Sequence, residues 1–300
     1  MVINNSKLNE ILKARGLTKS ALSTHLGISS RTIAKIKKAE NINDQVVNKI
    51  AAFLKISIED ISSSNAILET LKREKDAHID GGLYHATQIK LTYNSNHIEG
   101  SKLTEDQTRY IFETKTLGNL SPSIAIDDVI ETNNHFKCID YVLDHATDPL
   151  TCDLIKQLQL ILKQGTSFAS SFPSGEFKTL PNTVGGLETS APETVERDIN
   201  ALLGWYNSLK NVTFETIVEF HYRFEAIHPF QDGNGRVGRL IAFKECLNHN
   251  IIPFFIDDNY KWLYYRGLAE FKDEPNYLIE TCRFGQDQYR QLLNTFKTSY

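Results

Sequence analysis

The chain has 300 residues, enough for one large domain or two smaller ones with a buried core. Its apolar content of 41% and charged content of 23% are ordinary for a soluble globular protein, and a net charge of −4 argues against wholesale binding to nucleic acid or to an anionic membrane. Because no apolar run reaches the roughly 18 residues of a membrane helix and the first residues lack the apolar core of a signal peptide, we expect a cytoplasmic protein without a membrane partner.

The charge divides the chain into a basic beginning and an acidic remainder. Residues 1–60 hold eight Lys and two Arg against two Asp and three Glu, a balance of +5, so the remaining 240 residues carry −9. A small basic module followed by an acidic body predicts two domains joined by the polar run SSSN at 62–65. The first domain is then expected at residues 1–61 and the second at residues 62–300.

The first domain is predicted to contain five short helices between residues 5 and 60. Two of them are joined by a tight turn at Gly27, and the second of the pair is rich in Lys and Arg. This pattern resembles the helix-turn-helix domain of the repressor-type family, which reads DNA with the second helix. The candidate DNA contacts on that helix are Ser30, Arg31, Lys35 and Lys37.

A protein-docking or dimerising role for this small domain stays open beside DNA reading. A monomer with only three or four phosphate contacts would bind DNA weakly at physiological salt. If the domain reads DNA, we therefore expect a homodimer on a palindromic site.

From Ala66 onward, helical periodicity dominates, and the expected fold is all-α. A stretch rich in Gly, Pro, Ser and Thr between residues 165 and 187 interrupts this pattern. It predicts loops around a small β-hairpin, which we place from Gly175 to Gly186. The cysteines lack CxxC spacing and lie in helix-like contexts, so we expect buried free thiols. The four cysteines are Cys138, Cys152, Cys246 and Cys282.

The twelve residues HPFQDGNGRVGR, from His228 to Arg239, concentrate glycines, arginines and titratable groups between two predicted helices. The glycines on either side of Asn234 can aim several backbone N–H groups at one point, and they open a helix whose N-terminus carries partial positive charge. Arg236 and Arg239 lie near that end, where an uncompensated cation costs about 0.3–1 kcal/mol. The combination predicts a site for a multiply charged anion such as a di- or triphosphate.

Two further side chains of the motif suggest roles beside that anion. Asp232 offers a carboxylate of the kind that Mg²⁺ takes together with phosphate oxygens and water. His228 is the one group in the motif suited to take a proton from an incoming hydroxyl near neutral pH. Two competing patterns fit less well. A dinucleotide-binding fold requires a strand before its GxGxxG, and the residues before GNGRVG have helical periodicity. A calcium-binding loop is excluded because Arg236 would occupy a ligand position.

The motif matches HPFxDGNGRxxR, the signature of Fic-domain proteins, at every fixed position, and the resemblance runs from about residue 80 to residue 265. It implies an all-α fold that moves AMP from ATP, with Mg²⁺, onto a Tyr, Thr or Ser hydroxyl of a target protein. By the resemblance, His228 deprotonates that hydroxyl and Asp232 holds Mg²⁺. The phosphate-binding residues that it implies are Gly233, Asn234, Gly235, Arg236 and, for the γ-phosphate, Arg239.

The choice of donor is narrowed by the glycines of the motif. Relatives that transfer phosphate carry a lysine and altered glycines in this loop, whereas Gly233 and Gly235 are intact here. The motif therefore favours nucleotidyl transfer, while other nucleotides or a phosphocholine-like donor stay open.

A second motif, SNHIEG from Ser95 to Gly100, resembles the inhibitory sequence [S/T]xxxE[G/N] of the same family. Glu99 is predicted in the last turn of a helix, where a carboxylate faces the negative end of the dipole and needs a cationic partner. The resemblance implies that Glu99 bonds Arg239, which leaves the γ-phosphate without a partner and ATP misaligned for in-line attack. In some relatives the same glutamate positions water that removes AMP, so a deAMPylating activity stays open.

The expected hairpin resembles the flap of the family, whose edge strand could align a target segment by main-chain pairing. Phe177 and Lys178 are the candidate docking residues, and a plain surface loop is the alternative. The leading hypothesis is a self-inhibited protein adenylyltransferase. The other is a DNA-binding regulator or toxin-like autoregulator that uses the Fic body to sense nucleotide.

Overall fold

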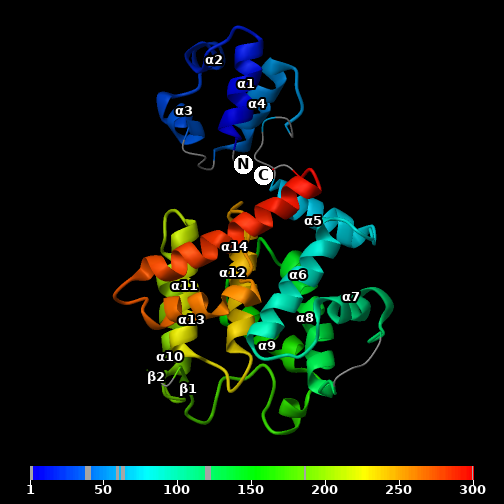
Figure 1. The fold of residues 1–300 in the computed structure, drawn as a ribbon. Helices are drawn as coiled ribbons and strands as arrows, with labels where there is room; N and C mark the ends of the chain where they lie inside the picture. Colours follow the sequence, from blue (N-terminus) through cyan, green and yellow to red (C-terminus); the bar gives the residue numbers. More distant parts are fainter. Residues whose placement is uncertain are drawn as a thin grey trace. The chain divides into compact units, whose positions relative to one another are not determined.

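The computed structural model describes residues 3–37, 42–58, 61, 65–118, 123–185, 187–298 and 300. Within these residues it is built from α-helices and one two-stranded sheet, so the expected all-α fold with a small hairpin is confirmed (Figure 1). The chain separates into two compact units, Met1–Ala66 and Ile67–Tyr300. Of the linker expected at 62–65, residues 62–64 lie outside the described part.

The first unit encloses a core of its own. Thr18 caps α2 by accepting a hydrogen bond from the Ala21 N–H at 3.1 Å, and Gly27 ends it at φ 64°, the left-handed conformation needed for the turn into α3. The fifth helix, expected at 57–61, includes residues 59 and 60, which lie outside the described part. The helices that the structure describes here are α1 Asn5–Ala14, α2 Lys19–Leu26, α3 Ser30–Lys37 and α4 Asp44–Leu54. Each contributes buried aliphatic side chains to the core, among them Leu8, Leu22, Ile36 and Ile50.

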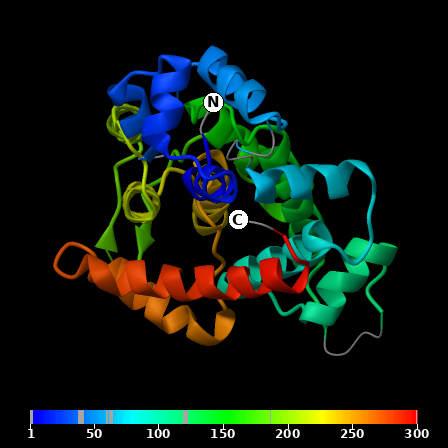
Figure 2. The same ribbon diagram turned by 90° about the horizontal axis from the view of Figure 1, so that it is seen from above.

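The helices of the second unit pack around one central helix. Helix α12 packs against α6, α8, α9 and α11, while α13 and α14 lie side by side in both views (Figures 1 and 2). Because α12 is buried along almost its whole length, each polar side chain on it must find a partner inside the protein. The helices of this unit are α5 Ala66–Asp76, α6 Leu83–Ile98, α7 Glu105–Thr114, α8 Ile126–Asp144, α9 Cys152–Lys163, α10 Val195–Asn207, α11 Phe214–Ile227, α12 Asn234–Asn248, α13 Lys261–Ala269 and α14 Pro275–Thr295.

Threonines set the starts of several of these helices. Thr104 and Gln107 form a reciprocal capping box at the start of α7, and Thr213 and Thr216 form another at the start of α11. Thr151 caps α9 by accepting a hydrogen bond from the Leu154 N–H at 3.2 Å. Local sequence therefore fixes where the helices around α12 begin.

The small hairpin is present but lies later in the chain than predicted. Strands β1 (Thr183–Val184) and β2 (Leu187–Glu188) pair antiparallel, whereas the expected hairpin ran from Gly175 to Gly186, of which residue 186 lies outside the described part. The residues before β1 bond instead to the loop after α11. The Lys178 N–H donates to the Pro229 carbonyl at 2.9 Å, so this segment pairs with the loop rather than with a strand.

All four cysteines are free, as expected. Cys138, Cys246 and Cys282 are buried, and Cys152 is half-buried. Burial raises the pKa of the Cys246 thiol well above its usual value, so this side chain packs as a small apolar group. None of the helices in the described residues combines the length and apolar character needed to cross a bilayer.

Candidate active site

The HPFQDGNGRVGR loop joins the end of α11 to the start of α12. His228 ends α11 in the left-handed conformation at φ 51°, and its N–H donates to the Phe224 carbonyl at 2.9 Å. Asn234 closes the loop, because its Oδ1 accepts from the Phe230 N–H and its Nδ2 donates to the Phe230 carbonyl, both at 2.8 Å. The Asn234 side chain is thus committed to the turn, and its backbone N–H is what it can offer a ligand.

The two glycines of the loop leave room at the N-terminus of α12. Gly233 caps the helix at φ 87°, a conformation that a side chain would strain. A Cβ on Gly235 would lie 2.3 Å from Glu99 Oε1, so only glycine lets that carboxylate come so close to the helix end. A carboxylate from α6 therefore sits where the first N–H groups and the dipole of α12 attract an anion.

Arg239 is held by the C-terminal end of α6. Its Nη2 donates to Glu99 Oε1 at 2.7 Å and to the Ser95 carbonyl at 2.9 Å, and its Nε donates to Ser95 Oγ at 3.0 Å. Its Nη1 donates to Tyr264 Oη at 3.4 Å. The Glu99–Arg239 contact that the resemblance implies is present, and Ser95 adds two bonds to the same guanidinium.

The charge of Glu99 is maintained by these neighbours. Burial raises the pKa of the Glu99 carboxyl, but the charges of Arg239 and Arg236 and the bond to Arg239 outweigh it, so the pKa lies below its usual value. The Glu99 side chain is 33% exposed, while that of Arg239 is 5% exposed. The carboxylate is therefore ionised at neutral pH and lies at the solvent side of the pair.

Arg236 is neutralised by a different carboxylate. Its Nη1 bonds to Glu131 of α8, and its Nη2 lies 3.7 Å from Asp232 Oδ1. Glu131 also bonds to Lys163, the last residue of α9, whose Nζ donates to Asp232 Oδ2 at 2.5 Å. These contacts join four charged side chains beside the loop: Glu131, Lys163, Asp232 and Arg236.

The sequence prediction missed Glu131 and Lys163. Both lie on helices far from the motif in sequence, and a charged residue on a helix is ordinarily exposed. Here the side chains of Glu131 and Lys163 are 14% and 3% exposed. Only the packing of α8 and α9 against α12 brings them to the loop.

Asp232 has the surroundings of a carboxylate that could take a metal ion together with a phosphate group. Burial raises the pKa of its carboxyl, but Lys163 and Arg236 outweigh that effect and hold the pKa below its usual value. Its side chain is 49% exposed beside the glycine turn. Among the described residues, no three His, Cys, Asp or Glu side chains form a metal site by themselves, so Asp232 suits Mg²⁺ only with phosphate oxygens and water as the other ligands.

His228 is a neutral base in reach of solvent. Burial lowers the pKa of its ring below the usual value, although its side chain is 18% exposed. Its Nδ1 lies 3.8 Å from Oε2 of Glu225, one turn earlier in α11. A neutral imidazole in this position can accept a proton from an incoming hydroxyl.

Behind His228 lies a row of buried titratable groups that the sequence prediction also missed. Burial raises the pKa of Glu225 to about 8 and lowers the pKa of His221 to about 3. His221 Nδ1 lies 4.0 Å from Glu225 Oε1, and its Nε2 lies 2.7 Å from Tyr264 Oη. Since Tyr264 also contacts Arg239, the row reaches from His228 to the Arg239 guanidinium.

Of the two candidate docking residues, Lys178 is buried and Phe177 is half-buried. The Lys178 ammonium is buried and donates to Asn182 Oδ1 and Thr189 Oγ1, both at 2.6 Å, and burial lowers its pKa to about 8. Phe177 is half-buried with its ring centroid 5.6 Å from that of Phe230. Lys178 also donates to the Ile227 carbonyl at 3.3 Å, so both side chains are engaged inside the protein.

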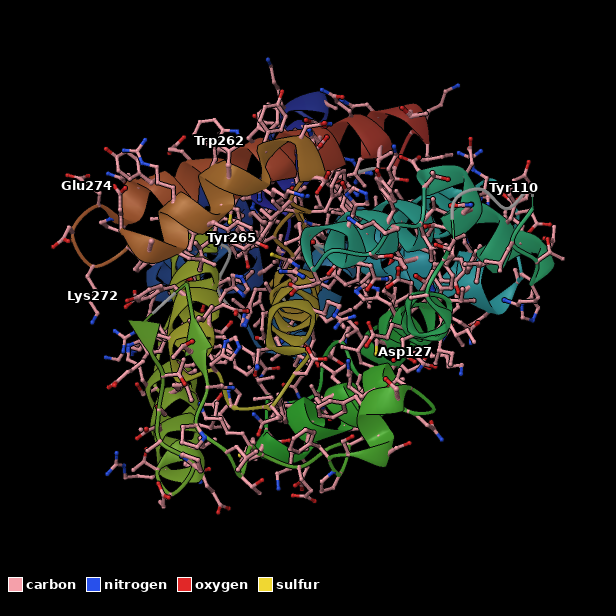
Figure 3. All side chains as sticks on the ribbon, turned by 60° about the horizontal axis from the view of Figure 1, so that its bottom comes forward. Tyr110, Asp127, Trp262, Tyr265, Lys272 and Glu274 are labelled. Carbon is pink, nitrogen blue, oxygen red and sulfur yellow. The ribbon has the colours of Figure 1, made fainter. Side chains whose placement is uncertain are left out.

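Aromatic side chains of α13 border the Glu99 side of the site. Tyr265, labelled in Figure 3, donates its hydroxyl to the Ile98 carbonyl at 2.9 Å. Tyr264, its neighbour in sequence, is buried against Arg239, with the guanidinium 5.8 Å from the ring centroid. Helix α13 therefore fixes both the end of α6 and the arginine that this end contacts.

The basic helix of the first unit presents three of its four candidate contacts to solvent. Ser30, Arg31 and Lys37 are exposed on α3, whereas Lys35 is half-buried beside the buried Ile36. An exposed basic face on the second helix of a helix-turn-helix is the arrangement that DNA reading needs.

Comparisons with known proteins agree with both units. Residues 149–245 match the Fic/DOC family, and residues 7–66 match a Cro/C1-type HTH DNA-binding domain. The chain is 28% identical over 182 residues to protein adenylyltransferase Fic of Nematostella vectensis and 27% identical over 211 residues to that of Culex quinquefasciatus. These alignments cover 59% and 67% of this chain, and the chain spans 42% of the length of each relative.

Solved structures show the same fold. A Fic domain containing signaling protein from Bacteroides thetaiotaomicron superposes with a TM-score of 0.61 at 23% identity, over 77% of this chain and 94% of that one. A Fic family protein from Desulfovibrio desulfuricans superposes with a TM-score of 0.59 at 20% identity, over 78% of this chain and 74% of that one. At these identities the likeness concerns the fold alone.

Proposed function

Because this chain carries a Fic/DOC-family domain behind a Cro/C1-type helix-turn-helix domain, we propose that it is a protein adenylyltransferase that Glu99 holds inactive. It moves AMP from ATP to a hydroxyl side chain of a target protein. One observation carries the proposal: the Glu99 carboxylate lies at the glycine-lined N-terminus of α12 and bonds Arg239 at 2.7 Å. We call this space between Gly233, Gly235 and Arg239 the notch. A notch that binds anions and is filled by the protein's own carboxylate is the arrangement that an inhibited polyphosphate site requires.

The chemistry follows from the groups around the loop. The N–H groups of Asn234 and Gly235 and the two arginines bind the phosphates of ATP, and the Gly233 N–H, which here donates to Asp232 Oδ1 at 2.6 Å, joins them once that bond is released. His228 takes the proton of the target hydroxyl, whose oxygen attacks the α-phosphorus as the bond to the β-phosphate oxygen breaks and pyrophosphate leaves. Mg²⁺ held by Asp232 would supply charge neutralisation for the polyphosphate.

Inhibition follows from competition for Arg239. Glu99 takes the Nη2 donor that a γ-phosphate oxygen would use, and a second anion at the same guanidinium would repel the carboxylate. ATP that binds beside Glu99 lacks its γ-phosphate contact, so its α-phosphorus is not placed for in-line attack. A signal or substitution that removes Glu99 from Arg239 therefore activates transfer.

Intact-mass spectrometry after incubation with ATP and Mg²⁺ tests this function. The Glu99→Gly variant should gain the mass of one or more AMP groups, on itself or on an added substrate protein, and wild type should gain much less. The matched control is the Glu99→Gly, His228→Ala double variant, which keeps the open notch without the base and should gain no mass. Equal labelling of wild type and Glu99→Gly would remove the inhibition claim.

The reverse reaction belongs to the same proposal. Glu99 lies close enough to the notch to orient a water molecule toward an AMP-modified side chain, and it is ionised. Release of AMP from a purified modified target by wild type, and its loss in Glu99→Gly, would demonstrate deAMPylation. Release that continues unchanged in Glu99→Gly would assign the hydrolysis to another group.

A second function is favoured by the first unit: DNA binding by a dimer through α3. It is supported by the match to a Cro/C1-type domain and by the exposure of Arg31 and Lys37. Each lost phosphate contact should reduce the slope of log affinity against log salt by about 1, so Arg31→Ala and Lys37→Ala should flatten it. Lys13→Ala, an exposed lysine on α1, is the control that should leave it unchanged. Affinity insensitive to salt would contradict this role.

A further inference from the structure

Lys163 occupies an unusual place for a lysine. Its side chain is 3% exposed, and its ammonium bonds two carboxylates, Glu131 and Asp232. The face of the Phe168 ring covers a third side, with its centroid 4.9 Å from Nζ. A buried ammonium held on three sides has a fixed position, in contrast to the mobile lysines of a surface.

Both oxygens of Asp232 are engaged in this arrangement. Oδ2 accepts from Lys163 at 2.5 Å, while Oδ1 accepts from the Gly233 N–H at 2.6 Å and faces Arg236 at 3.7 Å. Each donor uses one lone pair of its oxygen, so a divalent cation at either oxygen would lie next to a donor that is already in place. A cation and an ammonium on the same oxygen would also repel each other.

We propose that Lys163 is a positioning residue whose ammonium holds the Asp232 carboxylate, an ion pair that we call the latch. A divalent cation must displace the Lys163 ammonium before Asp232 can hold a metal. The inference rests on the proposed function in one respect, the role of Asp232 as metal ligand. The displacement is feasible because the Asp232 side chain is 49% exposed and can be reached from solvent.

Glu131 gives the displaced ammonium a place to remain. Because Glu131 already bonds both Lys163 and Arg236, Lys163 keeps an anionic partner when Asp232 turns to a metal ion. Without Glu131, release from Asp232 would leave a buried ammonium unpaired, which is strongly unfavourable. Lys163 therefore has an anionic partner in both states: Glu131 and Asp232 without a metal ion, and Glu131 when Asp232 holds one.

The latch also explains why metal and nucleotide belong together at this site. Asp232 alone offers the cation one carboxylate that is already neutralised. Polyphosphate bound at the glycine turn adds the negative oxygens that Mg²⁺ prefers, so the pair displaces Lys163 where the free ion does not. The resting enzyme is thereby kept from collecting divalent cations without ATP.

The test is Mn²⁺ binding to the full chain without nucleotide, followed by electron paramagnetic resonance of the free ion. Wild type should bind Mn²⁺ weakly, and Lys163→Met should bind it about five- to tenfold more tightly, because the ammonium no longer competes for the half-exposed Asp232 carboxylate. Adding Asp232→Asn to Lys163→Met should abolish the gain. Lys163→Gln, which keeps a polar end, serves as the second variant if the methionine perturbs folding.

Lys156→Met is the matched control for a simple change of net charge. Lys156 lies on the same helix and pairs with Glu176 at 3.0 Å, with its ammonium 4.7 Å from the Phe177 ring centroid. Its loss removes one positive charge from α9 without touching Asp232, so Mn²⁺ affinity should stay close to that of wild type.

The outcomes separate the latch from the proposed function. If folded Lys163→Met and Lys163→Gln bind Mn²⁺ no more tightly than wild type, or if the gain survives Asp232→Asn, the latch is wrong even when Glu99→Gly transfers AMP. If Mn²⁺ does not bind with ATP present and no AMP is transferred, the role of Asp232 falls and the latch falls with it. A gain in Lys163→Met but not in Lys156→Met, dependent on Asp232, supports it.

Discussion

Arg236 and Arg239 stand three residues apart on α12, and both side chains are 5% exposed, yet their carboxylate partners differ in position and exposure. Glu131 lies within α8, is 14% exposed and bonds a lysine as well as Arg236. Glu99 caps the end of α6 and is 33% exposed. Glu131 neutralises two buried cations, whereas Glu99 is more exposed and bonds one, so water or a ligand anion can replace Glu99 more readily than Glu131.

This difference assigns separate tasks to the two sides of the notch. The Glu131 side is a permanent part of the architecture, which keeps two cations next to the glycine turn whether or not a ligand is bound. On the Glu99 side, the proposed function requires a carboxylate that can be removed from the position of a ligand anion, and Glu99 is the more exposed of the two carboxylates. One helix N-terminus thus combines a fixed and a replaceable neutralising group.

The largest effect that separates the two carboxylates should be on stability. Glu131→Gln leaves Lys163 and Arg236 with Asp232 as their one remaining anion, so one buried positive charge is uncompensated and the free energy of unfolding should fall by about 3–5 kcal/mol. Glu99→Gln should cost less, about 1–3 kcal/mol, because Arg239 keeps its bonds to Ser95 and the amide oxygen of glutamine can still accept a hydrogen bond. Urea unfolding of the two variants measures both values, and equal losses would erase the distinction.

Replacing Glu99 and replacing Glu131 should change the rate of AMP transfer in opposite directions. Glu99→Gly should raise AMP transfer at least tenfold, about 1.4 kcal/mol, by freeing Arg239 for the γ-phosphate. Glu131→Gln should lower transfer, because Arg236 and Lys163 lose the anion that holds them beside the loop. Initial rates with labelled ATP check this, and activation by Glu131→Gln would show that both carboxylates inhibit transfer.

Glu225 is a third carboxylate, and it sharpens the contrast because no Lys or Arg of the described residues forms an ion pair with it. Burial raises its pKa to about 8, above the usual value near 4.5, with Arg239 opposing and Glu99 adding to the rise. The unfolded chain therefore loses the proton before the folded one, so this carboxyl destabilises the protein progressively as pH rises from about 4.5 to about 8. His221, His228 and Tyr264 are the other titratable groups around it.

Replacing Glu225 by its neutral isostere isolates this contribution. Glu225→Gln should flatten the decline in unfolding free energy between pH 6 and pH 8 by about 1 kcal/mol per pH unit. Urea unfolding at several pH values measures the slope in both chains. An identical slope in wild type and variant would mean that the carboxyl is ionised in the folded protein.

The smallest effect should come from Ser95, which supports the Glu99–Arg239 contact without being part of it. Ser95→Ala removes the bond from Arg239 Nε to Oγ but keeps the bond to the Ser95 carbonyl, so AMP transfer should rise only about two- to fivefold. Ser101→Ala, just beyond the helix end, is the control. A rise as large as that of Glu99→Gly would shift the inhibitory role from the carboxylate to the arginine's orientation.

The parts of the molecule that sequence predicted are those encoded locally. The loop from His228 to Arg239 and the end of α6 at Glu99 depend on glycine, capping and dipole rules that act within one or two turns. The contact between Glu99 and Arg239 was implied by resemblance to a family motif. That contact joins α6 to α12, and no local rule predicts it.

The parts that escaped prediction depend on tertiary packing. Glu131 and Lys163 approach the loop only because α8 and α9 pack against α12, and nothing in their local sequence distinguishes them from surface charges. The flap was placed too early because Lys178 and its neighbours bond to the Pro229 region instead of pairing as a strand. The burial of Lys178, a candidate docking residue, likewise follows from its contacts with Asn182 and Thr189.

Calorimetric titration of ATP with Mg²⁺ into Glu99→Gly addresses the central claim most directly, because it asks whether the notch takes a triphosphate once its carboxylate is removed. We expect tight binding in Glu99→Gly, weaker binding in wild type, and loss of the difference when Arg239→Met is added to both chains. If Glu99→Gly takes up no ATP, the notch at the start of α12 is not a nucleotide site.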